Sequence, residues 1–161
     1  MNLVLKFNLM LLGTVAVGMA VTAAIGQRIL QDRARQETVQ SARMMLETAM
    51  ATRAYTTKHV SGLIENQMKY DFLPESIPSF AATEVLKAMQ ANYPEYAYKE
   101  ATLNPTNPRD RVVDWEADVV QVFRRDPALT EVVGERATPT GMSLYLARPI
   151  TIKDAACLNC H

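Results

Sequence analysis

Residues 7 to 26 read FNLMLLGTVAVGMAVTAAIG, a run that contains no charged side chain. At the rise of an α-helix, about twenty residues span roughly 30 Å, which is the thickness of the hydrocarbon layer of a bilayer. The segment 1–26 is therefore predicted to be a transmembrane anchor. The alternative is a cleaved export signal, with Lys6 as its basic start and Val21-Thr22-Ala23 as its small-residue cleavage site.

The sequence that follows favours a long helix. From Gln27 to about Tyr70 there is no proline and only one glycine, Gly62. Apolar residues recur at steps of three and four, as expected for a helix that buries one stripe. They are Leu30, Ala34, Ala42, Met45, Leu46, Ala49 and Met50. The helix should end before Pro74, and its direct continuation from the apolar run favours an uncleaved anchor.

The rest of the chain predicts a mixed fold. A second helix is expected over 80–91 with Ser79 as its cap, a strand over 96–103, and a third helix that starts at Asp110 and ends near Asp126. Two short apolar runs around residues 138–141 indicate a hairpin. The expected class is α+β, with a small antiparallel sheet flanked by helices and one folded unit over 27–161.

Charge and composition exclude some classes of function. The 17 Lys and Arg residues balance the 17 Asp and Glu residues, and no basic stripe is interleaved with aromatic residues, so no nucleic-acid partner is expected. A cluster of acidic residues in the third predicted helix is best explained as its solvated face. These residues are Asp110, Asp114, Glu116 and Asp118. No base or substrate constellation indicates an enzyme.

The last five residues carry the strongest chemical signal. They read Cys157-Leu158-Asn159-Cys160-His161 and contain both cysteines of the chain. Two thiols at this spacing can each add to a vinyl group of haem, and the adjacent imidazole then reaches the iron. The motif predicts one covalently attached haem c, with Cys157 and Cys160 as attachment residues and His161 as the proximal iron ligand.

Three other uses of a Cys-x-x-Cys pair fit this sequence less well. A thioredoxin-like motif opens a helix near the start of a βαβ unit, whereas this pair closes the sequence. A zinc site needs four ligands, and His59 is the only other histidine. A disulfide between residues so close together would stabilise the fold little.

Haem attachment also predicts the location of the protein. Arg28, Arg33 and Arg35 follow the apolar run, and the positive-inside tendency would keep that side in the cytoplasm. Covalent haem attachment takes place on the outer side of the bacterial inner membrane, and this chemistry is the stronger signal. We therefore expect an inner-membrane protein with its haem domain in the periplasm, or a soluble periplasmic protein after signal cleavage.

The distal side of the iron is less well specified. The chain has no third cysteine, so the candidates are methionine, His59, water or an open site. Met44, Met45 and Met50 lie on the long predicted helix. Methionines are more often core filler than ligands, and an isolated histidine is more often a surface residue.

Several segments around the motif resemble a known family. They are Arg53-Ala54-Tyr55-Thr56, the residues from Phe72 to Pro78 and from Ala81 to Val85, the run Tyr98-Lys99-Glu100-Ala101-Thr102-Leu103-Asn104-Pro105-Thr106-Asn107, and Ala147-Arg148-Pro149. Together with the motif they resemble bacterial single-haem c-type domains with a PAS-like fold, which often have no assigned function or are described as haem sensors. The resemblance covers about residues 42–161.

This resemblance implies further roles. The loop 74–78 and the turn 104–107 would wall the haem pocket, and Arg148 would pair with a haem propionate. Members of that family continue beyond the haem motif with a segment that covers the haem. The printed chain stops at His161, so we expect a domain that is incomplete at its C-terminus.

Two functions follow from these expectations. The first is an envelope sensor of redox state or of a small gas, in which a change at the iron is transmitted through the long helix to a signalling partner. The second is an electron-transfer cytochrome c subunit with a redox partner. The membrane is a partner in both, and a homodimer through the long helix is a further expectation.

Overall fold

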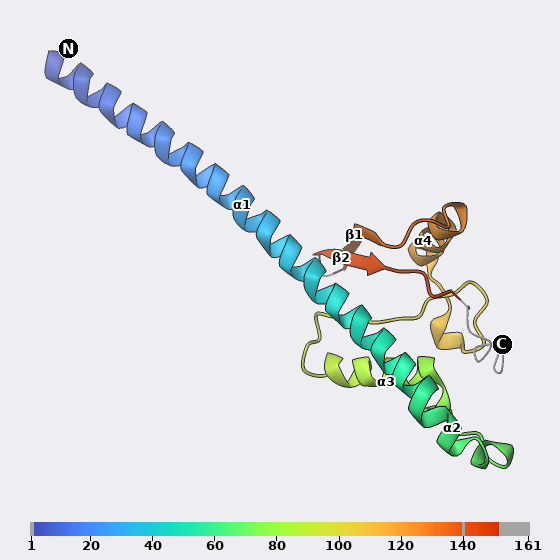
Figure 1. The fold of residues 1–161 in the computed structure, drawn as a ribbon. Coiled ribbons are helices and arrows are strands. Elements are labelled where there is room, and N and C mark those ends of the chain that lie inside the picture. Colours follow the sequence, from blue (N-terminus) through green and yellow to red (C-terminus); the bar gives the residue numbers. More distant parts are fainter. Residues whose placement is uncertain (1, 140, 152–161) are drawn as a thin grey trace. The chain divides into compact units, whose positions relative to one another are not determined.

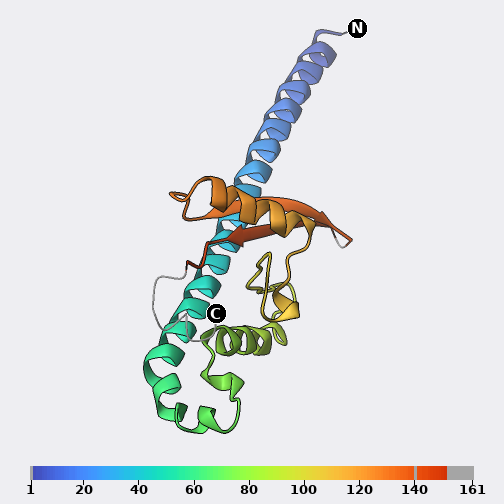
Figure 2. The same cartoon turned by 90° about the vertical axis from the view of Figure 1, so that its right-hand side faces the viewer.

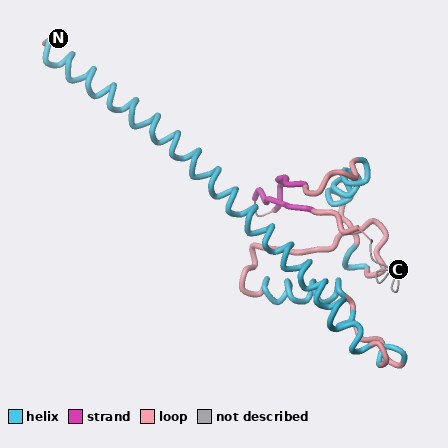
Figure 3. The backbone as a smooth tube through the Cα atoms, in the orientation of Figure 1, coloured by secondary structure: helices cyan, strands magenta, loops and turns pink. Residues whose placement is uncertain are grey.

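The computed structural model describes residues 2–139 and 141–151 (Figure 1). The chain divides into two compact units, Met1–Gln40 and Ser41–His161. Helix α1, Leu3–Tyr55, provides the whole described part of the first unit and the start of the second. The order of the helices and strands can be followed in Figure 3.

The first unit is an apolar helix with exposed side chains. The helical run Leu3–Ile64 contains an 18-residue window with a mean hydropathy of 2.0, and none of that window is buried. A signal sequence and a membrane anchor both have these properties. The structure therefore confirms an apolar N-terminal helix and leaves its cleavage as a prediction.

The long helix continues into the second unit with a local change of pitch. After α1, the π-helix η1 covers Thr56–Val60 and the short helix α2 covers Ser61–Ile64, followed by the 3-10 turn η2, Gln67–Lys69. The hydroxyl groups of Thr52 and Thr56 donate to carbonyls one turn earlier, and such back-bonding competes with the regular helix ladder. The predicted long helix is confirmed, with its regular part ending at Ile64.

Helix α3, Pro78–Gln90, packs against α1, and Figures 1 and 2 both place it alongside. The 3-10 turn η3, Pro74–Ser76, precedes it. Ala49, Ala82 and Leu86 form the buried core between the two helices. Ser79 is not the cap, because Pro78 occupies the first helical turn and Ile77 is the N-cap residue. Proline suits that position, since its fixed backbone angle matches the helix and it has no N–H to satisfy.

Residues 96–103 are extended but do not form the expected strand. Their only pairing among the described residues is an isolated bridge between Thr102 and Arg111. Tyr98 and Glu100 lie half-buried, while Lys99 is exposed. The alternation of a strand is thus present, but a strand also needs a neighbouring strand to satisfy its backbone groups.

Helix α4 covers Asp114–Arg125 and begins later than predicted. The 3-10 turn η4, Pro108–Asp110, takes up the earlier residues, and Asn107 accepts a hydrogen bond from the backbone N–H of Arg109 at 3.1 Å. The carboxylate of Glu116 accepts from the backbone N–H of Val113 at 2.9 Å and so fixes the start of the helix.

Strands β1, Val132–Thr138, and β2, Gly141–Ala147, form the predicted antiparallel hairpin. Gly141 has a φ angle of 125°, which glycine adopts without strain. Helix α4 contacts the hairpin through Trp115, whose ring lies 5.1 Å from that of Tyr145 and 4.4 Å from the guanidinium carbon of Arg136. The α+β class is confirmed, and the PAS-like assignment stays a prediction.

Candidate functional site

The Cys-x-x-Cys-His motif, residues 157–161, lies outside the described residues. The structure does describe the chain that leads to it. Strand β2 ends at Ala147, Arg148 follows directly, and Cys157 comes nine positions after Arg148 in the sequence. The candidate site is therefore examined through Arg148, the distal-ligand candidates and the groups around them.

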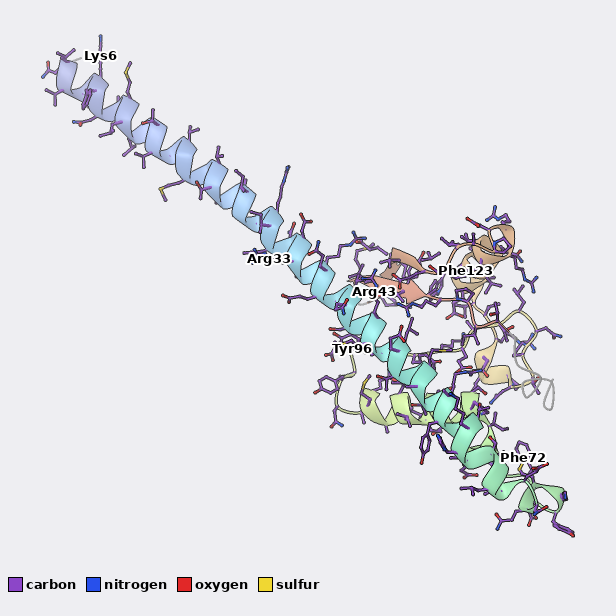
Figure 4. The ribbon with its side chains drawn as sticks, in the orientation of Figure 1. Lys6, Arg33, Arg43, Phe72, Tyr96 and Phe123 are labelled. Atoms are coloured by element: carbon purple, nitrogen blue, oxygen red, sulfur yellow. The ribbon has the colours of Figure 1, made fainter. Side chains whose placement is uncertain are left out.

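Arg148 lies in a network of four alternating charges. Its guanidinium donates to Glu131 at 2.9 Å and to Glu47 at 2.5 Å. On the other side of Glu131, the Nη2 atom of Arg43 donates to the carboxylate at 2.7 Å (Figure 4). Arg43 and Glu47 are one turn apart on α1, and Glu131 and Arg148 flank the open end of the hairpin. The network joins α1 to the hairpin.

Each charge in this network stabilises its neighbours. The hydrogen bond from Arg43 and the bonds from Arg148 lower the pKa of Glu131 below its ordinary value, against the opposing effect of burial. The hydrogen bond to Glu131 raises the pKa of Arg43. The pKa of Arg148 is raised first by Glu47 and then by Glu131. The structure thus shows Arg148 engaged by two carboxylates, and its contact with a haem propionate stays a prediction.

The structure separates the methionine candidates for the distal ligand. Met45 is half-buried on the face of α1 that packs on the second unit, where Ala49 follows one turn later. The side chains of Met44 and Met50 are 56% and 42% exposed. Consecutive helical residues point about 100° apart, so Met44 and Met45 cannot share a face. The sequence pattern alone did not separate these two neighbours.

His59, the fourth candidate, lies in the π-helix η1 and is exposed. Its ring lies 5.2 Å from that of Tyr55 and is tilted by 38°. A π-helical turn often marks a functional position, but exposure beside a tyrosine is equally the environment of a surface histidine. Its role as a ligand stays a prediction.

A second polar cluster, which the sequence reasoning missed, joins α1 to the extended segment 96–102. Glu100 accepts a hydrogen bond from the hydroxyl of Tyr98 at 2.9 Å and pairs with Arg53 at 2.5 Å. The side chains of Arg53 and Glu100 are only 20% and 12% exposed. Burial, reinforced by the charge of Glu100, raises the pKa of Tyr98. The alternation of Tyr98 and Glu100 on one side of the segment was the available signal.

The comparison with protein families decides which family the chain represents. The family model described as Tll0287-like matches residues 31–161. The chain belongs to the Tll0287-like family. This family is associated with c-type cytochromes and with c-type haem binding. No curated protein and no solved structure matches the chain.

The donor set of this Tll0287-like chain fits a c-type haem. Within 2–139 and 141–151, no group of three or more His, Cys, Asp or Glu residues is placed to hold a metal ion. Cys157, Cys160 and His161 supply the two thiols and the imidazole that covalent haem attachment requires. Sulfur and nitrogen donors at this spacing match the chemistry associated with the family.

Proposed function

We propose that the protein carries one haem c, held by thioether bonds at Cys157 and Cys160 and ligated by His161. The observation that carries this proposal is the Cys-x-x-Cys-His sequence, residues 157–161, within a chain of the Tll0287-like family. The haem supplies iron redox and ligand-binding chemistry when it is bound. Residues of the chain would set the ligands and the polarity around the iron.

Met45 is our preferred protein ligand on the distal side. It is the only one of the three methionine candidates that combines partial burial with a position on the packed face of α1. A thioether there would be shielded from solvent, whereas Met44 and Met50 would first have to leave exposed positions. If no side chain binds the iron, the distal position is free for water or a gas.

We propose that the haem domain, residues 27–161, acts in the periplasm as a sensor of redox state or of a small gas. Support comes from helix α1, which continues without interruption from the apolar segment 1–26 into the second unit. A change at the iron that alters the packing of α1 would then be transmitted along a stiff element. The PAS-like resemblance supports the same role, with an anchored membrane helix and a signalling partner.

An electron-transfer cytochrome is the second candidate function. Support for it is the association of the Tll0287-like family with c-type cytochromes. In this role the protein would fix the reduction potential through its ligands and its burial of the haem, and α1 would serve only as an anchor. Neither candidate involves enzymatic catalysis.

Spectra separate the two candidates. Protein from cells able to attach haem is measured oxidised, reduced, and reduced with carbon monoxide or nitric oxide. A rapid change on gas addition indicates a vacant or labile distal site and supports sensing. A six-coordinate haem that does not respond to gas supports electron transfer and argues against gas sensing.

Membrane attachment and dimer formation are tested on the same full-length protein. We propose that the apolar helix stays in the membrane and that two copies associate through α1. Washing membranes at alkaline pH should leave the protein in the pellet, whereas release into the soluble fraction would support signal cleavage. Crosslinking in membranes should give a band of twice the mass.

A further inference from the structure

The charge network around Arg148 contains one firm contact and one weak contact. Glu131 receives hydrogen bonds from both Arg43 and Arg148, and its side chain is only 19% exposed. Glu47 receives a bond from Arg148 alone among the printed contacts of the network, and its side chain is 68% exposed. Exposed ion pairs contribute little net stability, because water and salt compete for both charges.

The two contacts therefore have different mechanical roles. The Arg43–Glu131 pair fixes the start of β1 to α1, since the carboxylate is largely buried and is bound by a guanidinium fork. The Arg148–Glu47 pair fixes the end of β2 to the next turn of α1. That second pair can open without disturbing the first, because Arg148 and Arg43 contact Glu131 independently.

The position of the weaker pair in the sequence gives it significance. Arg148 is the first residue after β2, on the chain that leads to the haem-binding motif nine positions later. A displacement of that chain acts on Arg148 before it reaches the hairpin. Glu47, in turn, belongs to the helix that continues to the N-terminal apolar segment.

We propose that the Arg148–Glu47 ion pair is a releasable clamp that couples the haem-bearing segment to helix α1. When the pair is closed, the end of β2 and α1 are held together. When it opens, the turn of α1 around Glu47 is released from the hairpin while Arg43 keeps its contact with Glu131. The inference rests on the proposed sensor function and names the contact through which the signal leaves the haem domain.

Hydrogen exchange on the full-length haem protein in detergent tests the clamp. Exchange of α1 amides within 41–55 is compared between the oxidised and reduced states. We expect a several-fold difference in wild-type protein and a loss of that difference in Glu47→Gln, which removes the charge but keeps the size. Glu37→Gln, at another exposed position of the same helix, is the matched control and should retain the wild-type difference.

The outcomes distinguish this inference from the function on which it rests. Protein that retains no covalent haem overturns both. Haem protein in which α1 exchange is independent of the iron state, or responds equally in wild-type and Glu47→Gln, overturns the clamp and leaves haem binding intact. A double-mutant cycle of Glu47→Ala and Arg148→Ala adds a readout that needs no redox change. Additive effects on exchange would show that the two residues are not coupled.

Discussion

The ring of Tyr145 lies directly over Gly134, its cross-strand partner in the hairpin, and a Cβ atom built at Gly134 would come within 2.4 Å of that ring. The same ring packs on Trp115 of α4 with centroids 5.1 Å apart. An aromatic side chain thus covers the exposed backbone of a glycine in a strand while it contacts the neighbouring helix. Gly134 is required by this contact and not by its backbone angle.

Gly134→Ala should therefore destabilise the second unit. The new methyl group displaces the Tyr145 ring and weakens its contact with Trp115, and overpacking of this kind costs about 1–3 kcal/mol. Urea unfolding followed by circular dichroism measures the loss. Gly62→Ala is the matched control, because nothing lies within 4 Å of its added Cβ atom and the residue is in helix α2. It should be neutral or stabilising by up to about 1 kcal/mol, and equal losses in both variants would contradict this explanation.

The Arg53–Glu100 pair should contribute more stability than an exposed pair of the same type. Glu100→Gln leaves Arg53 partly buried without its charged partner, and hydrogen bonds to charged groups contribute about 1.5–3 kcal/mol. Glu84→Gln removes the partner of Arg109, where both side chains are at least 33% exposed, and should cost less than about 1 kcal/mol. A smaller loss in Glu100→Gln than in Glu84→Gln would argue against the importance of the buried pair.

Tyr98 should make the fold sensitive to alkaline pH. Its pKa is raised above the ordinary value of 10.0 in the folded state, mainly by burial. Above that pH the unfolded chain loses its proton more readily than the folded chain, so stability is complete below pH 10.0 and falls as the pH rises further. The fall should be smaller in Tyr98→Phe than in wild-type protein. Tyr70→Phe, at a side chain that is 88% exposed, should behave like wild type. Parallel curves for all three proteins would exclude the effect.

The distal-ligand proposal predicts a different response from neighbouring methionines. Met45→Ala should change the absorption spectrum of the reduced haem, because removal of an iron ligand alters its coordination. Met44→Ala and Met50→Ala should leave the spectrum unchanged, since both side chains are exposed. A change in Met50→Ala with none in Met45→Ala would reverse the assignment. If no methionine variant changes the spectrum, His59→Ala is the remaining test of a protein ligand.

Local sequence patterns identified most of the helices and the hairpin. The three- and four-residue spacing of Val119 and its neighbours predicted helix α4, and Gly141 marked the hairpin turn. The strand over 96–103 was wrong because its alternation reflects packing on α1 and not pairing with another strand. Whether a segment finds a partner strand depends on distant parts of the chain, which a local pattern does not report.

The candidate site was accessible to sequence reasoning only in part. The haem motif is recognisable because its chemistry needs a fixed spacing of adjacent residues. The networks of Arg148 and Arg53 join residues that are far apart in the sequence, such as Glu47 and Arg148, which are separated by 101 positions. Charged residues of this kind are common on surfaces, so only the folded structure shows which of them meet.

Covalent haem attachment is the central claim, and denatured protein tests it most directly. The full chain is produced with a competent cytochrome c maturation system, unfolded in detergent, and examined for porphyrin that remains with the polypeptide. The account predicts one haem on wild-type protein and none on the variant with both Cys157→Ser and Cys160→Ser. Wild-type polypeptide that emerges free of porphyrin would contradict the account.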